Sequence, residues 1–452
     1  MKRFTIILIL LGAALLGAQD RGILSLEQAH ELALHNNAAY QAKLAELEAA
    51  KWGKTSALSN FLPSLSLDGT LLYMDPAASY QAGGTTLKLN NDIRSFGLSL
   101  SQPLFLGGKI WQGYQMSRIA LDMAQTGLEA QRLALFSEVD NLYLAVLQTQ
   151  ELLAISELDK RSAELNLQIA RLKYDSGLLA NADYLRFQSQ LASKEVTLLQ
   201  AQTALQLSQL SLRNYLGISY LPSVEDFDPI ESDQSLQVLE DYDNADAAAL
   251  TALALERGKA ASTSLRLLDS SVELSRRAHM ISKGSFLPTL MLIGSRKYEE
   301  NGLDRYEFEA SNQILLTASV PILPQLGNYA DMKKAGFALK KARLEAITAT
   351  DGILLATEAS VLNLVSAAKQ VRAARLSLDY SQQSYEQLQE RFRLNLISAK
   401  DLLDAELMLS AARIAHSNAI YNYHKARISL MQSLGFTDAQ ELDSMILIGA
   451  NK

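Results

Sequence analysis

The sequence predicts a mainly α-helical chain that is duplicated and that carries two β-hairpins suited to a membrane β-barrel. Three observations lead to this fold class. Residues recur at a fixed offset, very long proline-free stretches have helical periodicity, and each repeat contains a pair of segments in which apolar and polar residues alternate.

The duplication is visible in pairs of residues. The segment Phe61–Leu65 returns as Phe286–Leu290. Pairs that lie 218 positions apart are Pro103 and Pro321, Gly177 and Asn395, Asp183 and Asp401, Leu185 and Leu403, and Gly217 and Gly435. A constant offset over this distance indicates a duplicated unit. We predict repeat 1 at residues 19–217, an acidic linker at 218–244, repeat 2 at 245–435 and a C-terminal tail at 436–452.

The N-terminus predicts export. Lys2 and Arg3 precede the apolar run Ile6–Ala18, which is followed by polar sequence. This is the composition of a secretory signal peptide, predicted at residues 1–18 with cleavage after Ala18. The alternative is an N-terminal anchor, but the run is too short to span a bilayer.

Composition narrows the possible classes of protein. The chain has no cysteine, so an exported form depends on packing or oligomerisation rather than on disulfides. Its net charge of −7 argues against nucleic acid as a partner. No other stretch approaches eighteen consecutive apolar residues, so we expect no transmembrane helix. Membrane contact would then require a closed β-barrel.

The helical periodicity is interrupted at equivalent places in the two repeats. Long helices are predicted at Lys109–Lys173 and Asn328–Leu394, each roughly 100 Å in length at 1.5 Å per residue. Gly177 and Asn395 follow them, and both residue types tolerate the left-handed conformation that ends a helix. The other predicted helices are the initial ones, Leu26–Asn60 and Ala245–Ser285, and the return ones, Asn181–Tyr215 and Ala399–Leu434. Each repeat therefore contains an antiparallel, coiled-coil-like helical hairpin.

Period-two alternation predicts the strands. It runs through Ser64–Tyr73 and Tyr306–Val320, through Thr86–Leu104 with one slip, and less regularly through Leu290–Tyr298. We therefore predict β-hairpins at 64–104 and 289–321. The residues expected to face lipid are Leu65, Leu67, Leu71, Phe308, Ile314 and Leu316, and those expected to face a lumen are Asp68, Glu307, Glu309 and Gln313.

Long two-faced strands in an exported chain favour a transmembrane barrel. A soluble hairpin packed on the helices is the alternative. Four strands cannot close a membrane barrel, since about eight is the minimum. Two chains would give a barrel whose lumen side chains fill, whereas three chains would give twelve strands and an aqueous lumen. A pore therefore requires at least a trimer.

Several segments together resemble the TolC-like outer-membrane efflux protein family. They are Leu24–Ala29, the two Phe-Leu-Pro strand entries, Gln102–Phe105 with Gly107-Gly108, and Asn395–Ala405. The resemblance implies a homotrimer with a twelve-stranded barrel in the outer membrane and a twelve-helix tunnel in the periplasm. It also implies a periplasmic adaptor and an inner-membrane pump as partners. The implied function is a passive exit duct for efflux or type I secretion. In such a family, 218–244 and the tail form a belt around the tunnel, and Met445–Ile448 is expected to pack there.

The resemblance also implies functional residues. It places Asp401, Asp404, Phe392 and Ile397 at the periplasmic aperture, although some members carry an arginine where this chain has Ile397. Asp401 and Asp404 lie on one helix face near a helix start, so ordinary capping is the alternative. Threefold symmetry would make acid rings, which favour cations. Gly177, Leu178, Leu179, Asn395 and Leu396 are expected to form adaptor-docking tips; the alternative is an ordinary buried turn.

No motif predicts an enzyme, a cofactor or a metal site. Gly107-Gly108-Lys109 lacks the spacing of a phosphate loop. The histidines show no ligand spacing; they are His30, His35, His279, His416 and His424. The alternative function is a structural coiled-coil protein of the cell envelope without a pore, but such a protein has no use for two-faced hairpins. A periplasmic adaptor is disfavoured because it needs more strands.

Overall fold

A computed structural model describes residues 23–88, 91–226, 233–300, 307–322 and 325–449. The predicted signal peptide, residues 1–18, lies outside these ranges, as does Tyr306 in a predicted strand. The chain divides into two compact units. The sheet unit comprises Leu44–Leu128 and Ser264–Thr350, and the helical unit comprises the remaining segments. Each unit is described by itself.

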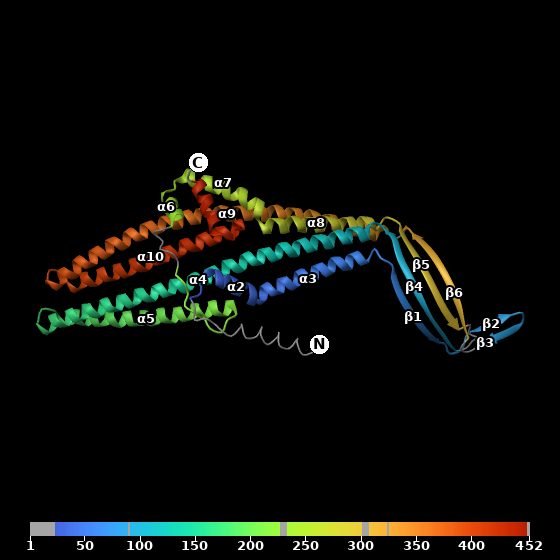
Figure 1. The fold of residues 1–452 in the computed structure, drawn as a ribbon, viewed down its shortest axis with the longest axis horizontal. Helices are drawn as coiled ribbons and strands as arrows, with labels where there is room; N and C mark the ends of the chain where they lie inside the picture. Colours follow the sequence, from blue (N-terminus) through green and yellow to red (C-terminus); the bar gives the residue numbers. More distant parts are fainter. Residues whose placement is uncertain (1–22, 89–90, 227–232, 301–306, 323–324, 450–452) are drawn as a thin grey trace, which may run out of the picture. The chain divides into compact units, whose positions relative to one another are not determined.

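The sheet unit contains a four-stranded antiparallel sheet. Its strands are β1 (Ser64–Tyr73), β4 (Asp92–Leu106), β5 (Thr289–Glu300) and β6 (Phe308–Ser319). They lie side by side in the order β1-β4-β5-β6, so the hairpins of the two repeats join through β4 and β5 (Figure 1). The predicted four-stranded, two-hairpin arrangement is confirmed.

One predicted strand is wrong in its N-terminal part. The start of Thr86–Leu104 belongs to β3 (Thr85–Lys88), which pairs with β2 (Ser79–Ala82) in a separate two-stranded hairpin. Gly83 and Gly84 form its turn, with φ of 58° and 85°. Two consecutive positive φ angles match the twist of a tight hairpin, which glycine adopts without strain. The Gly-Gly pair therefore forms the turn of an additional hairpin, and β4 begins only at Asp92.

The register sorts the side chains into an apolar face and a polar face, because directly opposite residues in an antiparallel sheet share a face. Residues on the apolar face include Leu65, Leu67, Leu71, Phe96, Leu98, Leu100, Leu292, Phe308, Ile314 and Leu316. Residues on the polar face include Ser66, Asp68, Thr70, Ser99, Ser295, Glu309, Ser311, Gln313 and Thr317. All residues expected to face lipid thus share one face. Asp68, Glu309 and Gln313 share the other, while Glu307 precedes β6.

Both faces of this sheet are open in the single chain. Every residue of β1 and β6 is exposed, and Leu65 and Ile314 are 69% and 86% exposed. The alternative of a soluble hairpin packed on the helices is therefore not observed. β1 and β6 are also the edges of the sheet, so each presents a row of backbone groups that can pair with another strand.

Two glycines, one from each repeat, meet within the sheet unit beside the sheet. Gly107 directly follows β4 and has a φ of 62°, and Gly284 ends α8 (Thr263–Gly284). A Cβ atom on either glycine would collide with the carbonyl oxygen of the other. The backbones of Gly107 and Gly284 therefore cross so closely that only glycine fits at either position.

Two helical hairpins dominate the helical unit. α4 (Lys109–Asp175) leads to α5 (Asn181–Leu216), and α9 (Gln325–Arg393) leads to α10 (Ala399–Leu434). Each return helix lies alongside the long helix before it (Figure 1). These bounds lie within three residues of the predicted ones. The N-terminal parts of α4 and α9 belong to the sheet unit.

The initial helices are each broken, which the prediction of continuous helices missed. Repeat 1 has α2 (Leu26–Asn36) and α3 (Ala38–Ser59), and repeat 2 has α7 (Asn244–Ala261) and α8. The breaks fall at Asn37 and Ser262. The Asn37 side chain accepts hydrogen bonds from the backbone N–H groups of Ala39 and Tyr40, at 3.0 and 3.1 Å, and so caps α3.

The duplication extends to the packing at these breaks. Gly217 and Gly435 end the two return helices in the left-handed conformation. A Cβ on Gly217 would lie 2.9 Å from the Asn36 Cβ, and one on Gly435 would lie 3.4 Å from the Ala261 carbonyl oxygen. In both repeats, therefore, a return helix ends against the end of an initial helix.

Part of the acidic linker is a docked helix. α6 (Gln234–Asp241) and α11 (Ala439–Gly449) pack together, and Leu236, Leu239 and Ile446 are buried in one core with residues of α7, α9 and α10. Arg427 of α10 joins both segments through Asp233 at 2.8 Å and Asp443 at 2.6 Å. The expectation of a solvated linker is therefore wrong for 233–241, because arginines of the bundle pair with its acids.

One described helix is long and apolar enough to cross a membrane by length and composition. It is α9, and 33% of the relevant window is buried in the single chain. The sequence predicts no transmembrane helix. Because a helix from a packed bundle passes the same test, this result carries little weight.

Candidate functional site at the ends of the helical hairpins

The turns of the two helical hairpins have the same backbone structure. We call Ser176–Ala180 the first tip and Leu394–Ser398 the second tip. Gly177 and Asn395 have φ of 72° and 60°. Leu178 N–H donates to the Lys173 carbonyl at 2.8 Å, and Leu396 N–H donates to the Arg391 carbonyl at 2.9 Å. Both are six-to-one bonds of a Schellman ending, so the predicted helix ends at Gly177 and Asn395 are observed.

The residues expected to dock an adaptor differ in exposure. Leu178 is 64% exposed and Leu396 is 67% exposed. Leu179 and Ile397 are half-buried and pack against a core at the tips. Each tip therefore presents a leucine to solvent and turns the next aliphatic residue inward, and the second tip also exposes Leu394. Docking by these residues stays a prediction.

Phe392 lies inside this tip core. It is 2% exposed, and its ring centroid lies 5.5 Å from that of Phe187 on α5. Ala399 and Leu402 of α10 are buried in the same cluster. In the single chain, Phe392 thus joins the two hairpins rather than projecting from them.

A buried lysine that the sequence analysis did not single out holds the two tips together. Lys173, in the last turn of α4, is 8% exposed. Its Nζ donates to the Phe392 carbonyl and, at 2.6 Å, to the Asn395 Oδ1, and it lies 4.1 Å from the centroid of the Phe392 ring. Burial lowers the pKa of the Lys173 ammonium. No carboxylate forms an ion pair with Lys173 among the described residues, so carbonyl groups and a ring face satisfy its charge.

The two candidate aperture aspartates are exposed, and each has a local partner. Ser398 donates to Asp401 through its backbone N–H at 3.1 Å and its hydroxyl at 2.7 Å, which completes a capping box. These hydrogen bonds keep the pKa of Asp401 below its ordinary value. Lys400 pairs with Asp404 at 2.7 Å. That hydrogen bond and the charge of Asp404 raise the pKa of Lys400.

The capping alternative for Asp401 is therefore present in the structure, and it does not exclude a role at an aperture. Asp401 is the third residue of α10, and the hydrogen bonds that it accepts from the N-cap residue Ser398 keep its carboxylate ionised while it stays exposed. Lys400 is the second residue that the sequence analysis missed. Its position four residues before Asp404 is the signal that could have found it.

Two buried polar clusters join the hairpins further from the tips. In the first, Asp159 of α4 accepts from Lys194 of α5 at 2.8 Å, from Arg413 of α10 at 3.2 Å and from Ser410. In the second, Asn166 of α4 donates to Glu406 of α10 at 2.8 Å and to Tyr385 of α9 at 3.0 Å. Because buried polar groups are costly to separate from their partners, these clusters fix how the hairpins pack.

The described residues contain no group of three or more His, Cys, Asp or Glu side chains placed to hold a metal ion. His30 pairs with Asp140 at 2.6 Å and stacks on Phe136. His424 is half-buried, and burial lowers its pKa to about 4. His30 and His424 thus pack within the helical unit.

Comparison with known proteins identifies the family. The family model described as outer membrane efflux protein matches residues 29–218 and 254–436, which is most of the chain. The chain is 22% identical to outer membrane protein TolC of Vibrio cholerae over 428 residues, covering 92% of each protein. It is 23% identical to the alkaline protease secretion protein AprF of Pseudomonas aeruginosa over 444 residues, covering 97% of this chain and 89% of AprF.

A solved structure agrees with this fold. The Campylobacter jejuni CmeC outer membrane channel superimposes with a TM-score of 0.77 at 17% identity, covering 93% of this chain and 89% of CmeC. The family match covers both repeats, including α4, α5, α9 and α10 with their tips. The chain therefore belongs to the outer membrane efflux protein family.

Proposed function

We propose that three copies of this chain form a passive duct from the periplasm to the exterior, with a gate at the hairpin tips. Family membership makes the chain an outer-membrane efflux or secretion channel. The observation that carries the trimeric duct is the sheet, which has an exposed apolar face, a polar face and two free edges. Lipid around the apolar face, water against the polar face and neighbouring strands at both edges would satisfy all three features.

Strand number supports three copies. One chain supplies four strands to the sheet, and a membrane barrel needs about eight or more. With three chains, β6 of one copy would pair with β1 of the next, and twelve strands would close. The polar face, which carries Asp68, Glu309 and Gln313, would then line water, as barrel lumens require.

The long helix α9 also has an unpartnered face. Leu326, Phe337, Leu344, Leu355 and Leu362 are all more than half exposed, and they recur at steps of eleven and seven residues. These steps return to the same side of an α-helix. Exposed apolar stripes of this length are covered in assemblies, and helices of the other copies in a tunnel would cover this one.

The tips fit the role of a gate and a docking site. Lys173 joins the two tips within one chain, and Asp401 and Asp404 supply acids that threefold symmetry would turn into rings. Leu178 and Leu396 offer exposed aliphatic groups to a periplasmic adaptor. An inner-membrane pump would supply energy and cargo. The names of the relatives, an efflux family and an alkaline protease secretion protein, support efflux or type I secretion.

Single cysteines test the barrel directly, since the chain has none of its own. Leu67→Cys and Leu98→Cys probe the apolar face, and Asp68→Cys and Ser99→Cys probe the polar face of the same strand pair. In whole cells, a small water-soluble maleimide should label the polar-face pair much faster. Faster labelling of the apolar-face pair would contradict the proposed orientation.

A further inference from the structure

The apolar face of the sheet also carries polar residues, and two of them, Arg296 and Asn312, are cross-strand partners. Asp92, Arg94 and Glu300 lie on this face as well, and there Arg94 pairs with Asp92 at 2.9 Å. Arg296 of β5 lies directly opposite Leu98 of β4 on one side and Asn312 of β6 on the other. Residues paired in this way share a face. Arg296 and Asn312 therefore sit among leucines on the face that the proposed function turns toward lipid, where an uncompensated charge is unfavourable.

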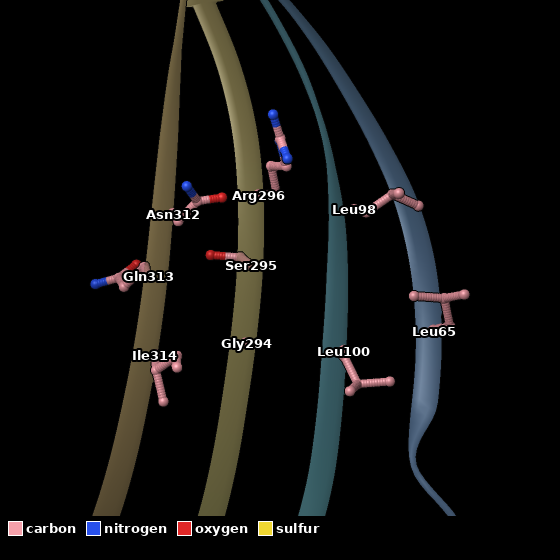
Figure 2. Close-up of a pocket in the computed structure, with 9 residues that line it drawn as sticks. All are labelled: Leu65, Leu98, Leu100, Gly294, Ser295, Arg296, Asn312, Gln313 and Ile314. Carbon is pink, nitrogen blue, oxygen red and sulfur yellow. The ribbon is translucent and has the colours of Figure 1, made fainter.

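A hollow lies next to this pair. Gly294 is two positions before Arg296 on the same face, and it is flanked by Leu100 and Ile314. Nothing lies within 4 Å of a Cβ built on Gly294. The hollow is lined by residues that include Leu65, Leu98, Leu100, Arg296, Asn312 and Ile314 (Figure 2). Its floor is Gly294, its aliphatic lining comes from four of these side chains, and Ser295, Arg296, Asn312 and Gln313 supply its polar lining.

The Arg296 guanidinium is available for an anion. The side chain is exposed and extends away from Gly294 (Figure 2). It lies 5.4 Å from the Tyr298 ring centroid, and no ion pair joins it to a carboxylate among the described residues. The neighbouring Lys297 is on the polar face and pairs with Glu299 at 2.9 Å. Lys297 thus has an acid beside it, as Arg94 has in Asp92, whereas Arg296 has a ring.

We propose that Arg296 and Asn312 bind the phosphate of an anionic membrane lipid, one of whose acyl chains lies in the hollow over Gly294. This inference rests on the proposed function, which places the apolar face in lipid. A guanidinium binds phosphate through two parallel hydrogen bonds, and the Asn312 amide supplies another donor. An alkyl chain fits the part of the hollow that is lined by the leucines and Ile314. The lipid phosphate also neutralises the arginine, which a bare hydrocarbon surface cannot do.

Lipid retention by purified trimers tests this site. Trimers in nanodiscs that contain equal amounts of phosphatidylglycerol and phosphatidylcholine are released and weighed by native mass spectrometry. The wild type should retain phosphatidylglycerol preferentially. Arg296→Gln should reduce that preference by about tenfold or more, because the site loses the charge-assisted hydrogen bonds of the guanidinium. Lys297→Gln is the matched control, because it removes the same charge from the other face and should change nothing.

Gly294→Leu is a second variant that keeps the charge. Open space surrounds the position, so the strand accepts the side chain, and the leucine fills the hollow. It should reduce retention of both lipids. Equal effects of Arg296→Gln and Lys297→Gln, or full retention by Gly294→Leu, would overturn the lipid site. Conductance in planar bilayers separates the two proposals. A wild type that conducts without selecting lipid would contradict only the lipid site, and trimers that do not conduct, including after Lys173→Met, would contradict the proposed duct.

Discussion

Lys173 and Phe392 join the ends of the two helical hairpins through one side chain. The Lys173 Nζ lies 4.1 Å from the Phe392 ring centroid and donates to the carbonyl oxygen of the same residue. The two residues are 219 positions apart and belong to different repeats. Opening the tips would require this buried ammonium to leave both the ring and the carbonyl. The contact is therefore the strongest single candidate for holding a closed gate within the chain.

Lys173→Met should weaken the closed state. Methionine keeps most of the aliphatic volume but donates no hydrogen bond to the Phe392 carbonyl or to Asn395. Hydrogen bonds to charged groups contribute about 1.5–3 kcal/mol each. We expect larger single-channel conductance and a lower melting temperature of the trimer. Lys160→Met is the control, since Lys160 makes only exposed pairs at 3.6 and 3.7 Å. If Lys173→Met conducts like the wild type, the contact between Lys173 and Phe392 does not hold the gate closed.

Replacing the two aspartates and replacing Lys400 should have opposite effects on channel block by multivalent cations. Asp401→Asn with Asp404→Asn should reduce cation selectivity and block by multivalent cations, because the rings lose their charge. Lys400→Gln should increase block several-fold, because it frees Asp404 from its partner. Dose–response curves of block in reconstituted trimers measure both. If neither variant shifts the curve, these residues serve only to start α10.

A charge on either exposed tip leucine should stop export. Leu178→Asp or Leu396→Asp replaces an aliphatic contact with a carboxylate, which an apolar docking surface would have to desolvate. The trimer should still assemble, because both side chains are exposed. Ser176→Asp adds the same charge within the first tip, two residues before Leu178, and should leave export intact. Export assays paired with crosslinking check this, and full export by both leucine variants would exclude docking at the tips.

Glu406 should make the stability of the bundle depend on pH. Burial raises its pKa above the ordinary 4.5, although Asn166 and Lys194 oppose the shift and Asp159 adds to it. Between 4.5 and the raised folded value, the folded state binds a proton that the unfolded state lacks, so stability falls as pH rises through this window. Glu406→Gln should remove that slope and raise the melting temperature at neutral pH by a few degrees. If Glu406→Gln instead lowers the melting temperature at neutral pH, the ionised form of Glu406 stabilises the fold and the prediction is wrong.

Local sequence signals predicted the long elements well. The ends of α4 and α9 follow from Gly177 and Asn395, because each of these residues tolerates positive φ and stands where the apolar periodicity breaks. The two-faced strands follow from alternation, which the register then confirmed for Leu65 and Ile314. Signals of this kind depend only on neighbours in sequence.

The missed features depend on contacts between distant residues. No periodicity indicates that Lys173 reaches Phe392, or that Asp233 pairs with Arg427, because these partners meet only after the hairpins pack. The breaks at Asn37 and Ser262 are intermediate cases. Both residue types favour caps, but they also occur within helices, and the packing of Gly217 and Gly435 beside them identifies the break.

Planar-bilayer recording of the purified wild-type trimer tests the central claim most directly. A twelve-stranded barrel continued by a helical tunnel should give discrete conductance steps that select cations. Multivalent cations added on the side of the hairpin tips should block them. A folded, heat-modifiable trimer that inserts into bilayers and yet shows no conductance, including after Lys173→Met, would contradict the account.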